Sequence, residues 1–403
     1  MVLFNNTESK KDFGREILGP IFYDFCARLH SYLCSHIKEN SGGEPVVAYL
    51  ARAGLRLRYL YDLYRQSNNA EFVVDEKDFY ASRMSVAKGC LKNDFEYIVP
   101  IIVREYHNKT IGNLLRGVVN KDFVVPKKWE NLEVTCESFK NIYSDSHKSS
   151  AVIREYFNRQ SILLATYVKS CAGPKMSTFL VDSGWTGNTQ AMLMRTYRDI
   201  NWVGLYFGKW DYRRVHPSHF SSVVGLCLDG TTYDRRNPAS CILHYHHLIE
   251  GPLEPNFPST KEYVRNEITG EVEPDTLAAS ESAIAPGPRD GHFAGIVDYF
   301  HNQLSPSSQE VRQNAEKSYK KLSKLIRYPR KRDLSMMVVN DRSADFGRDE
   351  VKPVLIDPAP EGTSCIARLR RLDRSLWRQG QVVLEFPRSA WLIQRLVKFR
   401  PAV

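Results

Sequence analysis

Residues 177–193 read STFLVDSGWTGNTQAML, and the order of residue types in this stretch indicates the fold class. STFLV (177–181) is short and apolar, as in a strand buried on both faces, and QAMLMRTYRDI (190–200) has the apolar spacing of a helix. The turn DSGWTGNT joins the two and contains two glycines. We predict a strand, a tight turn and a helix, with Asp182 at the end of the strand.

The same order of elements occurs near the start of the chain. PVVAYL (45–50) is a β-branched strand, ARAG (51–54) a turn, and LRLRYLYDLYRQ (55–66) a helix. A further apolar strand, WVGLYFG (202–208), follows the helix of the first stretch. Strands that alternate with helices imply an α/β fold with a parallel, doubly wound sheet, whose ligands bind beyond the carboxyl ends of the strands. Both glycine-containing turns are predicted to lie at that edge.

Helices and an insertion are predicted around this sheet. Apolar residues three and four apart at 12–38 indicate a core-facing helix, bent near Pro20, within an N-terminal region 1–44. The sheet domain is predicted to span 45–265. An inserted cap is expected at about 85–150, where the sequence is mixed and contains a Lys-rich loop.

Within the cap, YIVPIIV (97–103) is a candidate strand. The stretch 266–291 is acidic and rich in Pro and Gly, and we predict a linker or a long surface loop there. Residues 292–403 are predicted to form a helical, basic C-terminal region that begins with a solvated helix at about 306–327.

Composition limits the class of protein. The chain has 403 residues, 42% hydrophobic and 25% charged, which is the balance of a globular rather than a disordered or fibrous protein. No apolar run reaches the ~18 residues of a membrane span, and the start MVLFNNTESKKD is too polar for a signal peptide, so we expect a cytoplasmic protein. Eight scattered cysteines without a CxxC pair indicate reduced thiols rather than a zinc ribbon or a disulfide framework.

Charge points to an anionic partner. The formal net charge is +10, and the basic residues are concentrated in roughly the last forty positions. That tail also contains Trp377, Trp391 and Phe399. Such a composition fits a peripheral helix resting on anionic lipid, and it fits equally a helix that packs its apolar face on the core.

The turn at 182–189 has the residue types of a sugar-phosphate site. Asp182 offers an acceptor to sugar hydroxyls, and Gly184 and Gly187 let backbone amides approach a ligand closely. Thr186 and Thr189 add hydroxyl donors at the start of a helix, whose dipole favours an anion. The simpler interpretation is a strand-turn-helix junction whose glycines serve only the turn.

The turn at 51–54 offers a matching anion site. Arg52 would present a planar, permanently charged fork to phosphate oxygens, while Ala53 and Gly54 leave the backbone amides accessible. Taken alone, Arg52 is better interpreted as a surface arginine on an ordinary strand-helix turn. Two such turns in this order, each on a strand-turn-helix unit, favour a functional pair.

The stretch 178–190 resembles the phosphoribosyl-diphosphate (PRPP) loop of type I phosphoribosyltransferases, in which a strand is followed by two acids and then Thr-Gly-x-Thr. Here Ser183 stands in place of the second acid, and the loop is one residue shorter. The resemblance implies that ribose and its 5-phosphate bind to Asp182, Ser183, Gly184, Trp185, Thr186, Gly187, Asn188 and Thr189. It also implies that the diphosphate binds to the first loop, which can hold a cis peptide in that family, through Ala51, Arg52, Ala53 and Gly54.

A wider resemblance covers about two thirds of the chain. The sequence is similar to glycan phosphoribosyltransferases of bacterial O-antigen and capsule biosynthesis, which transfer ribosyl 5-phosphate from PRPP to a sugar. The resemblance rests on FGREILGPIFYDFCARLH (13–30), VAYLARAGLRLRYLYDLY (47–64), FYASRMSV (79–86), FLVDSGWTGNTQAML (179–193), VGLYFGKWD (203–211) and HYHHLIEGP (244–252).

This resemblance implies partners and a cofactor. Mg²⁺ is expected, bound mainly through PRPP oxygens. The acceptor would be a glycan, plausibly lipid-linked at the inner membrane, and nucleic acid is not expected. A separate phosphatase is expected to act on the product, because VLIDPAPEG (354–362) lacks the second aspartate of a dehalogenase-type phosphatase.

Further candidate residues follow from the chemistry. A sugar hydroxyl needs a general base, for which Asp182, Asp211 and Glu250 are candidates. Arg83 and Lys209 are candidate phosphate partners. ILHYHHL (242–248) alternates as a strand would, which places His246 and His247 on opposite faces, so we predict no metal site. The alternatives are transfer to a nucleobase or small molecule, and a non-catalytic module that binds PRPP or a nucleotide.

Overall fold

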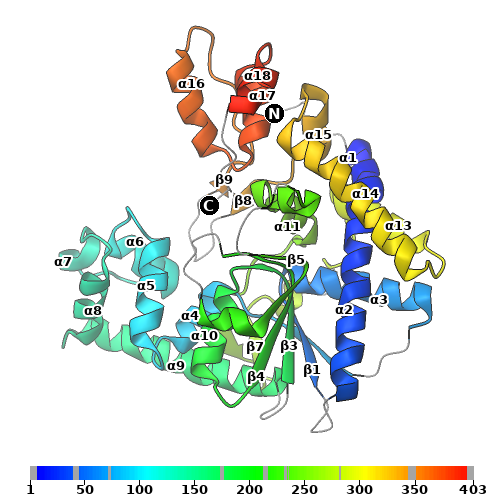
Figure 1. Cartoon of the computed structure of the whole chain (residues 1–403). Coiled ribbons are helices and arrows are strands. Elements are labelled where there is room, and N and C mark those ends of the chain that lie inside the picture. The colour runs from blue at the N-terminus through cyan, green and yellow to red at the C-terminus, as the bar shows by residue number, and fades with distance from the viewer. Residues whose placement is uncertain are drawn as a thin grey trace.

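A five-stranded, all-parallel sheet forms the centre of the computed structural model (Figure 1), which describes residues 7–39, 45–70, 74–172, 177–211, 217–230, 234, 236–280, 283–343 and 351–396. The strands lie in the order β2-β1-β3-β4-β5. Their bounds are β1 Val46–Leu50, β2 Asp75–Phe79, β3 Ser177–Trp185, β4 Asn201–Lys209 and β5 Val223–Asp229. This order places β1 beside β3, with β2 on the far side of β1, so the chain changes direction between β1 and β3.

Helices cover both faces of the sheet, which confirms the predicted doubly wound α/β class. In Figure 1, α2 (Gly19–Glu39) and α3 (Ala53–Asn68) lie on one face, and α4 (Arg83–Cys90), α9 (Lys148–Cys171) and α10 (Asn188–Thr196) on the other. All five residues of β1 are buried, as a strand covered on both faces requires. The strands predicted at 45–50, 177–181 and 202–208 are confirmed as β1, β3 and β4.

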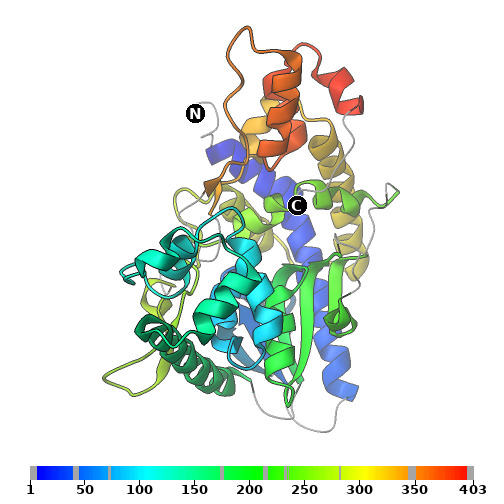
Figure 2. The same ribbon diagram turned by 90° about the vertical axis from the view of Figure 1, so that its left-hand side faces the viewer.

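The insertion beyond β2 is helical. It contains α5 (Phe95–Glu105), α6 (Ile111–Val118), α7 (Lys127–Glu130) and α8 (Cys136–Ser144), which stand together at one side of the sheet in Figures 1 and 2. The strand predicted at 97–103 is wrong, because this run lies in α5. Its buried residues Ile98, Val99, Ile101 and Ile102 are spaced as one face of a helix, and Pro100 is accommodated inside it.

The N-terminal helix is confirmed as three consecutive segments. These are α1 (Thr7–Phe13), a π-helical turn η2 (Gly14–Leu18) and α2, so the irregular turn lies just ahead of Pro20. Gly14 faces the carbonyl of His292, which a Cβ would approach to 2.2 Å, in the neighbouring helix α13 (Gly291–His301). The N-terminal helix therefore packs tightly against α13, which lies much later in the sequence.

Short elements link the sheet to the C-terminal helices. They are η3 (Ser218–Ser222), η4 (Pro238–His244), α11 (His247–Leu253), the hairpin β6 (Tyr263–Arg265) and β7 (Val272–Pro274), and α12 (Leu277–Ser280). The stretch predicted as a linker or loop, 266–291, thus contains β7 and α12. The contact of α11 with β3 places that helix over the carboxyl ends of the strands.

The C-terminal region is mostly helical. It contains α14 (Ser308–Arg327), η5 (Lys331–Asp333), α15 (Leu334–Met337), the strand pair β8 (Arg342–Ser343) and β9 (Val351–Lys352), α16 (Cys365–Arg371), η6 (Leu372–Arg374), α17 (Arg378–Glu385) and α18 (Ala390–Leu396).

The helix predicted at 306–327 is observed as α14, but it is not solvated all round. It buries residues such as Tyr319, Leu322 and Ile326, and it packs against α2 and η4. Its buried positions are separated by lysines and other polar residues, so the apolar face is hard to recognise in the sequence.

The tail divides into a packed and an exposed part. Trp377 is fully buried and stacks on Tyr245, with ring centroids 4.8 Å apart. Trp391, Leu392 and Leu396 of α18 are exposed. Across the described ranges, no helix is both long enough and apolar enough to traverse a bilayer.

Candidate functional site

The two glycine-containing turns meet where the sheet changes direction. β1 and β3 are neighbours in register, with Tyr49 opposite Val181, so the segments that follow them leave the sheet at the same edge. Gly54, in the first turn of α3, is pressed against β3: a Cβ on it would lie 2.6 Å from the Val181 carbonyl oxygen. The turns at 51–54 and 182–189 therefore leave the sheet side by side at the switch point, the position where doubly wound sheets bind ligands in a crevice beyond the strand ends.

Glycine conformations shape the second turn. Gly184 and Gly187 have φ values of +90° and +60°, the left-handed region that favours glycine, and Trp185 between them has φ +71°. Gly187 precedes α10, which begins at Asn188, and it provides no side chain to cap the first amides of that helix. Amides without a side-chain cap at the start of a helix, together with the positive end of its dipole, can bind an anion.

A histidine from another element fixes this turn. The ring nitrogen Nε2 of His219, in η3, lies 2.7 Å from the carbonyl oxygen of Thr186. Burial lowers the pKa of His219, so near pH 7 its neutral ring can donate this hydrogen bond. The sequence analysis missed His219, because nothing in the sequence places η3 next to the turn.

Asp182 is a carboxylate with perturbed acidity. It lies in β3 and is partly exposed, with Ser183 Oγ 3.5 Å from its Oδ1. Burial raises the pKa of Asp182 to about 7, and the nearby charge of Glu250 adds to the rise. A hydrogen bond donated by the Ser183 amide acts in the opposite direction and lowers the pKa. A carboxylate perturbed by burial and a second charge, at the edge of a crevice, is typical of functional sites.

Arg52 lies at the crevice but is held by the protein. The Ala51–Arg52 peptide bond is cis. Arg52 Nη1 donates a hydrogen bond to the Phe257 carbonyl at 2.9 Å, and Nη2 lies 3.3 Å from the Glu254 carboxylate. The guanidinium is therefore anchored to the chain that follows α11.

The other predicted phosphate partners have different surroundings. Lys209, at the end of β4, donates to the Val223 carbonyl at 3.0 Å and pairs with Asp229 at 3.6 Å. Arg83 begins α4 and lies 3.6 Å from Glu105 at the end of α5. The partners named here for Lys209 and Arg83 thus belong to β5 and to the cap helix α5.

Asp211 lines a cleft of about 860 Å³ between the cap and the turn at 182–189. Asp211, Thr186 and His219 line one side of it, and Tyr97 and Arg104 of α5 line the other. Of the three predicted bases, Asp182 and Glu250 thus lie together, whereas Asp211 faces the cleft.

Trp185 packs inside the site. It is 8% exposed, and its ring contacts His246 edge-on, with centroids 5.4 Å apart. Its indole Nε1 is buried and has no hydrogen-bond partner among the residues that the structure describes. A buried donor without an acceptor is unfavourable by about 1–3 kcal/mol, so an oxygen of water or of a ligand beside Trp185 would be stabilising.

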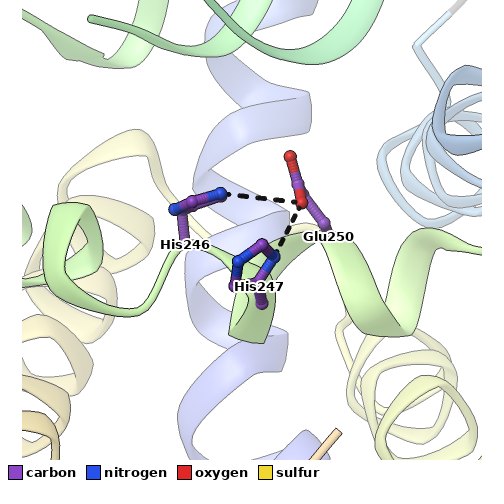
Figure 3. Close-up of side chains that lie close together, drawn as sticks. All are labelled: His246, His247 and Glu250. Atoms are coloured by element: carbon purple, nitrogen blue, oxygen red, sulfur yellow. Dashed lines mark hydrogen bonds and ion pairs between the residues drawn. The ribbon is translucent and has the colours of Figure 1, made fainter. Parts of the chain in front are cut away.

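The histidine cluster differs from the prediction (Figure 3). The alternation predicted for 242–248 is wrong, because these residues form η4 and the start of α11. The helix brings His246 and His247 to the same carboxylate: His246 Nε2 lies 3.9 Å and His247 Nδ1 3.3 Å from Glu250 Oε2. In a helix, residues three and four apart are neighbours, so the spacing HHxxE would have indicated this cluster.

Comparison with known proteins adds no family. No protein-family model matches the chain, and no curated protein matches it in sequence.

Proposed function

We propose that this chain is a glycan phosphoribosyltransferase, which transfers ribosyl 5-phosphate from PRPP to a sugar hydroxyl and releases diphosphate. The observation that carries the proposal is the meeting of residues 51–54 and 182–189 at the switch point between β1 and β3. The turn at 182–189 has residue types that suit a sugar phosphate. The turn at 51–54 contains Arg52, whose charge suits a diphosphate. The order β2-β1-β3-β4-β5 supports a nucleotide-type binding fold, and the specific phosphoribosyltransferase class is part of the proposal.

In this proposal the donor spans both turns. The amides at Gly187 and Asn188 would bind the 5-phosphate at the start of α10, and Asp182 would accept hydrogen bonds from the ribose hydroxyls. Arg52 would exchange its bond to the Phe257 carbonyl for the diphosphate oxygens, where its charge stabilises the leaving group.

A Mg²⁺ ion at this site would be bound by the oxygens of PRPP rather than by a full set of protein ligands. Among the described residues, the carboxylates beside the two turns include Asp182, Glu250 and Glu254, and Glu254 is already paired with Arg52, which leaves too few for an all-protein magnesium site. Mg²⁺ held by PRPP oxygens would neutralise the charge that develops on the departing diphosphate.

The acceptor side favours a sugar over a small base. The cleft of about 860 Å³ reaches Thr186 and Asn188 at the phosphate turn, and it is large for a single nucleobase. Asp211 lines this cleft, whereas Glu250 lies on the side of Asp182. We therefore assign the general base for the sugar hydroxyl to Asp211 and the ribose contact to Asp182.

The decisive experiment is calorimetric titration with PRPP and Mg²⁺, beside ribose 5-phosphate and the Asp182→Asn variant. Saturable binding that the substitution abolishes would support the donor site, and the absence of binding would refute the proposal. Diphosphate release on addition of lipid-linked or free glycans then tests transfer. Binding of PRPP without release for any glycan or nucleobase would favour the non-catalytic module.

A further inference from the structure

Three potential metal ligands converge at the start of α11. His246 precedes the helix, His247 begins it, and Glu250 lies one turn further along. One atom from each side chain lies within 4.8 Å of the others, and Glu250 Oε2 is 3.3 Å from His247 Nδ1 and 3.9 Å from His246 Nε2. Figure 3 shows the two rings turned toward the carboxylate.

These separations suit a common cation. In a tetrahedral zinc site with bonds of ~2.0–2.1 Å, neighbouring ligand atoms lie ~3.3 Å apart. The His247–Glu250 distance has this value, and the His246–Glu250 distance exceeds it by an amount that a rotation of one side chain can close. All three side chains are 12–19% exposed, so the cluster is shielded but accessible to an ion.

We propose that His246, His247 and Glu250 bind one divalent first-row transition-metal ion of the Zn²⁺ or Co²⁺ type. Two imidazoles and one carboxylate prefer such ions to Mg²⁺, which takes oxygen ligands. Three protein ligands leave at least one coordination position for water or a ligand oxygen, as in catalytic rather than structural zinc sites.

The surroundings point to a site that receives a ligand. Trp185 contacts His246, and its buried Nε1 has no acceptor within the described chain. A water or anionic oxygen on the metal would place an acceptor in the neighbourhood of this donor. This ion would be held by protein side chains, whereas the proposed magnesium would be held by PRPP oxygens, so the site does not depend on the proposed transferase activity.

The test is metal binding by the full chain without a polyhistidine tag. After treatment with a chelator, Co²⁺ is titrated with visible absorption as the readout, and Zn²⁺ displaces it in competition. One equivalent is expected, with the absorption of a site that contains nitrogen ligands. His246→Asn, His247→Asn and Glu250→Gln are each expected to weaken binding by more than the ~10- to 100-fold that loss of an outer partner costs.

A matched control removes a histidine elsewhere. His107 is exposed in the cap, and His107→Asn should leave the affinity unchanged. Equal Co²⁺ binding by wild type and the double variant His246→Asn/His247→Asn would overturn the proposal, as would no binding by the wild type.

A second measurement uses the wild-type protein alone, so it tests the site even if the substitutions prevent folding. Diethyl pyrocarbonate modifies accessible imidazoles, and mass spectrometry locates the adducts. Bound Zn²⁺ is expected to protect His246 and His247 but not His107. Equal modification of all three with and without Zn²⁺ would contradict the site, and neither experiment contains PRPP, so failure here is separate from failure of the transferase proposal.

Discussion

Glu250 in α11 acts on Asp182 in β3 through its charge, and together with burial it raises the pKa of the Asp182 carboxyl to about 7. The two residues come from different parts of the chain, and the contact of α11 with β3 brings their elements together. A protein gains nothing in stability from two carboxylates held near each other in a partly dry crevice. The arrangement is consistent with a site that stabilises a ligand at the expense of the free protein.

The first prediction concerns Asp182→Asn in chelator-treated protein. The folded-state pKa of about 7 lies above the unfolded value near 3.8, so the folded protein holds the proton more tightly, and its stability falls as pH rises between these values. Asparagine removes this dependence. We expect the variant to melt at a higher temperature than wild type at pH 8, with the difference shrinking as pH falls through 7 and closing near pH 4, in thermal unfolding followed by circular dichroism.

PRPP affinity should change in the opposite direction. The same Asp182→Asn variant is expected to lose PRPP binding at pH 8, where the wild type is stable enough to titrate. A variant that keeps wild-type affinity would remove Asp182 from the ribose site, whereas one that is less stable at pH 8 would contradict the raised pKa of Asp182.

The second prediction separates the two turns. Arg52→Ala should weaken diphosphate and PRPP binding by about 10- to 100-fold, the worth of hydrogen bonds to a charged group, and leave ribose 5-phosphate binding nearly unchanged. Arg58→Ala is the control, because Arg58 lies in α3, the helix that Arg52 precedes, and also pairs with a carboxylate, Asp78. Competition calorimetry measures all three ligands, and equal losses for the two variants would mean a general effect of charge.

The sheet could be predicted where its strands are buried. PVVAYL, STFLV and WVGLYFG are continuous apolar runs, because β1, β3 and β4 lie in the middle of a covered parallel sheet. β2 reads DEKDF and lies at the edge, where a strand needs no apolar run, so the sequence pattern missed it. YIVPIIV shows the opposite error, since a short β-branched run has no period that distinguishes a strand from a buried helix.

The site was predictable to a similar degree. The two turns follow directly from strands, so their meeting follows from parallel topology. The cleft at Asp211 and the hydrogen bond from His219 to Thr186 depend on how the cap and η3 pack, which local sequence does not encode. The cluster of His246, His247 and Glu250 was missed because the period was taken as two rather than 3.6.

The third prediction concerns Asp211→Asn. If Asp211 is the base on the acceptor side, the variant should bind PRPP with wild-type affinity and lose roughly 10²- to 10⁴-fold in the rate of transfer to the glycan. Rapid-quench measurement of diphosphate release at saturating PRPP checks this. Weaker PRPP binding with an unchanged rate would instead place Asp211 in the donor site.

The fourth prediction tests the close approach of α3 to β3. Gly54→Ala would put a Cβ 2.6 Å from the Val181 carbonyl oxygen and 2.7 Å from the Tyr49 carbonyl carbon, both rigid backbone atoms. We expect a loss of about 1–3 kcal/mol in urea denaturation, as for overpacked cores. Gly287→Ala is the matched control, because its Cβ would meet only Asp290 Oδ2, at 3.4 Å. Equal stability of the two variants would show that α3 is not held tightly against β3 at Gly54.

The fifth prediction concerns acid stability and His292 in α13. His292 is buried, its Nε2 lies 2.7 Å from the Met336 carbonyl oxygen, and burial lowers its pKa from 6.5 to about 4. The folded protein therefore binds fewer protons than the unfolded chain, so stability is complete above pH 6.5 and is lost as pH falls toward 4, by up to about 3 kcal/mol. His292→Gln is expected to be less stable at pH 7 but to lose less stability between pH 7 and 4.5. Urea midpoints across this range measure both slopes, and parallel slopes would mean that His292 does not set the acid limit of the fold.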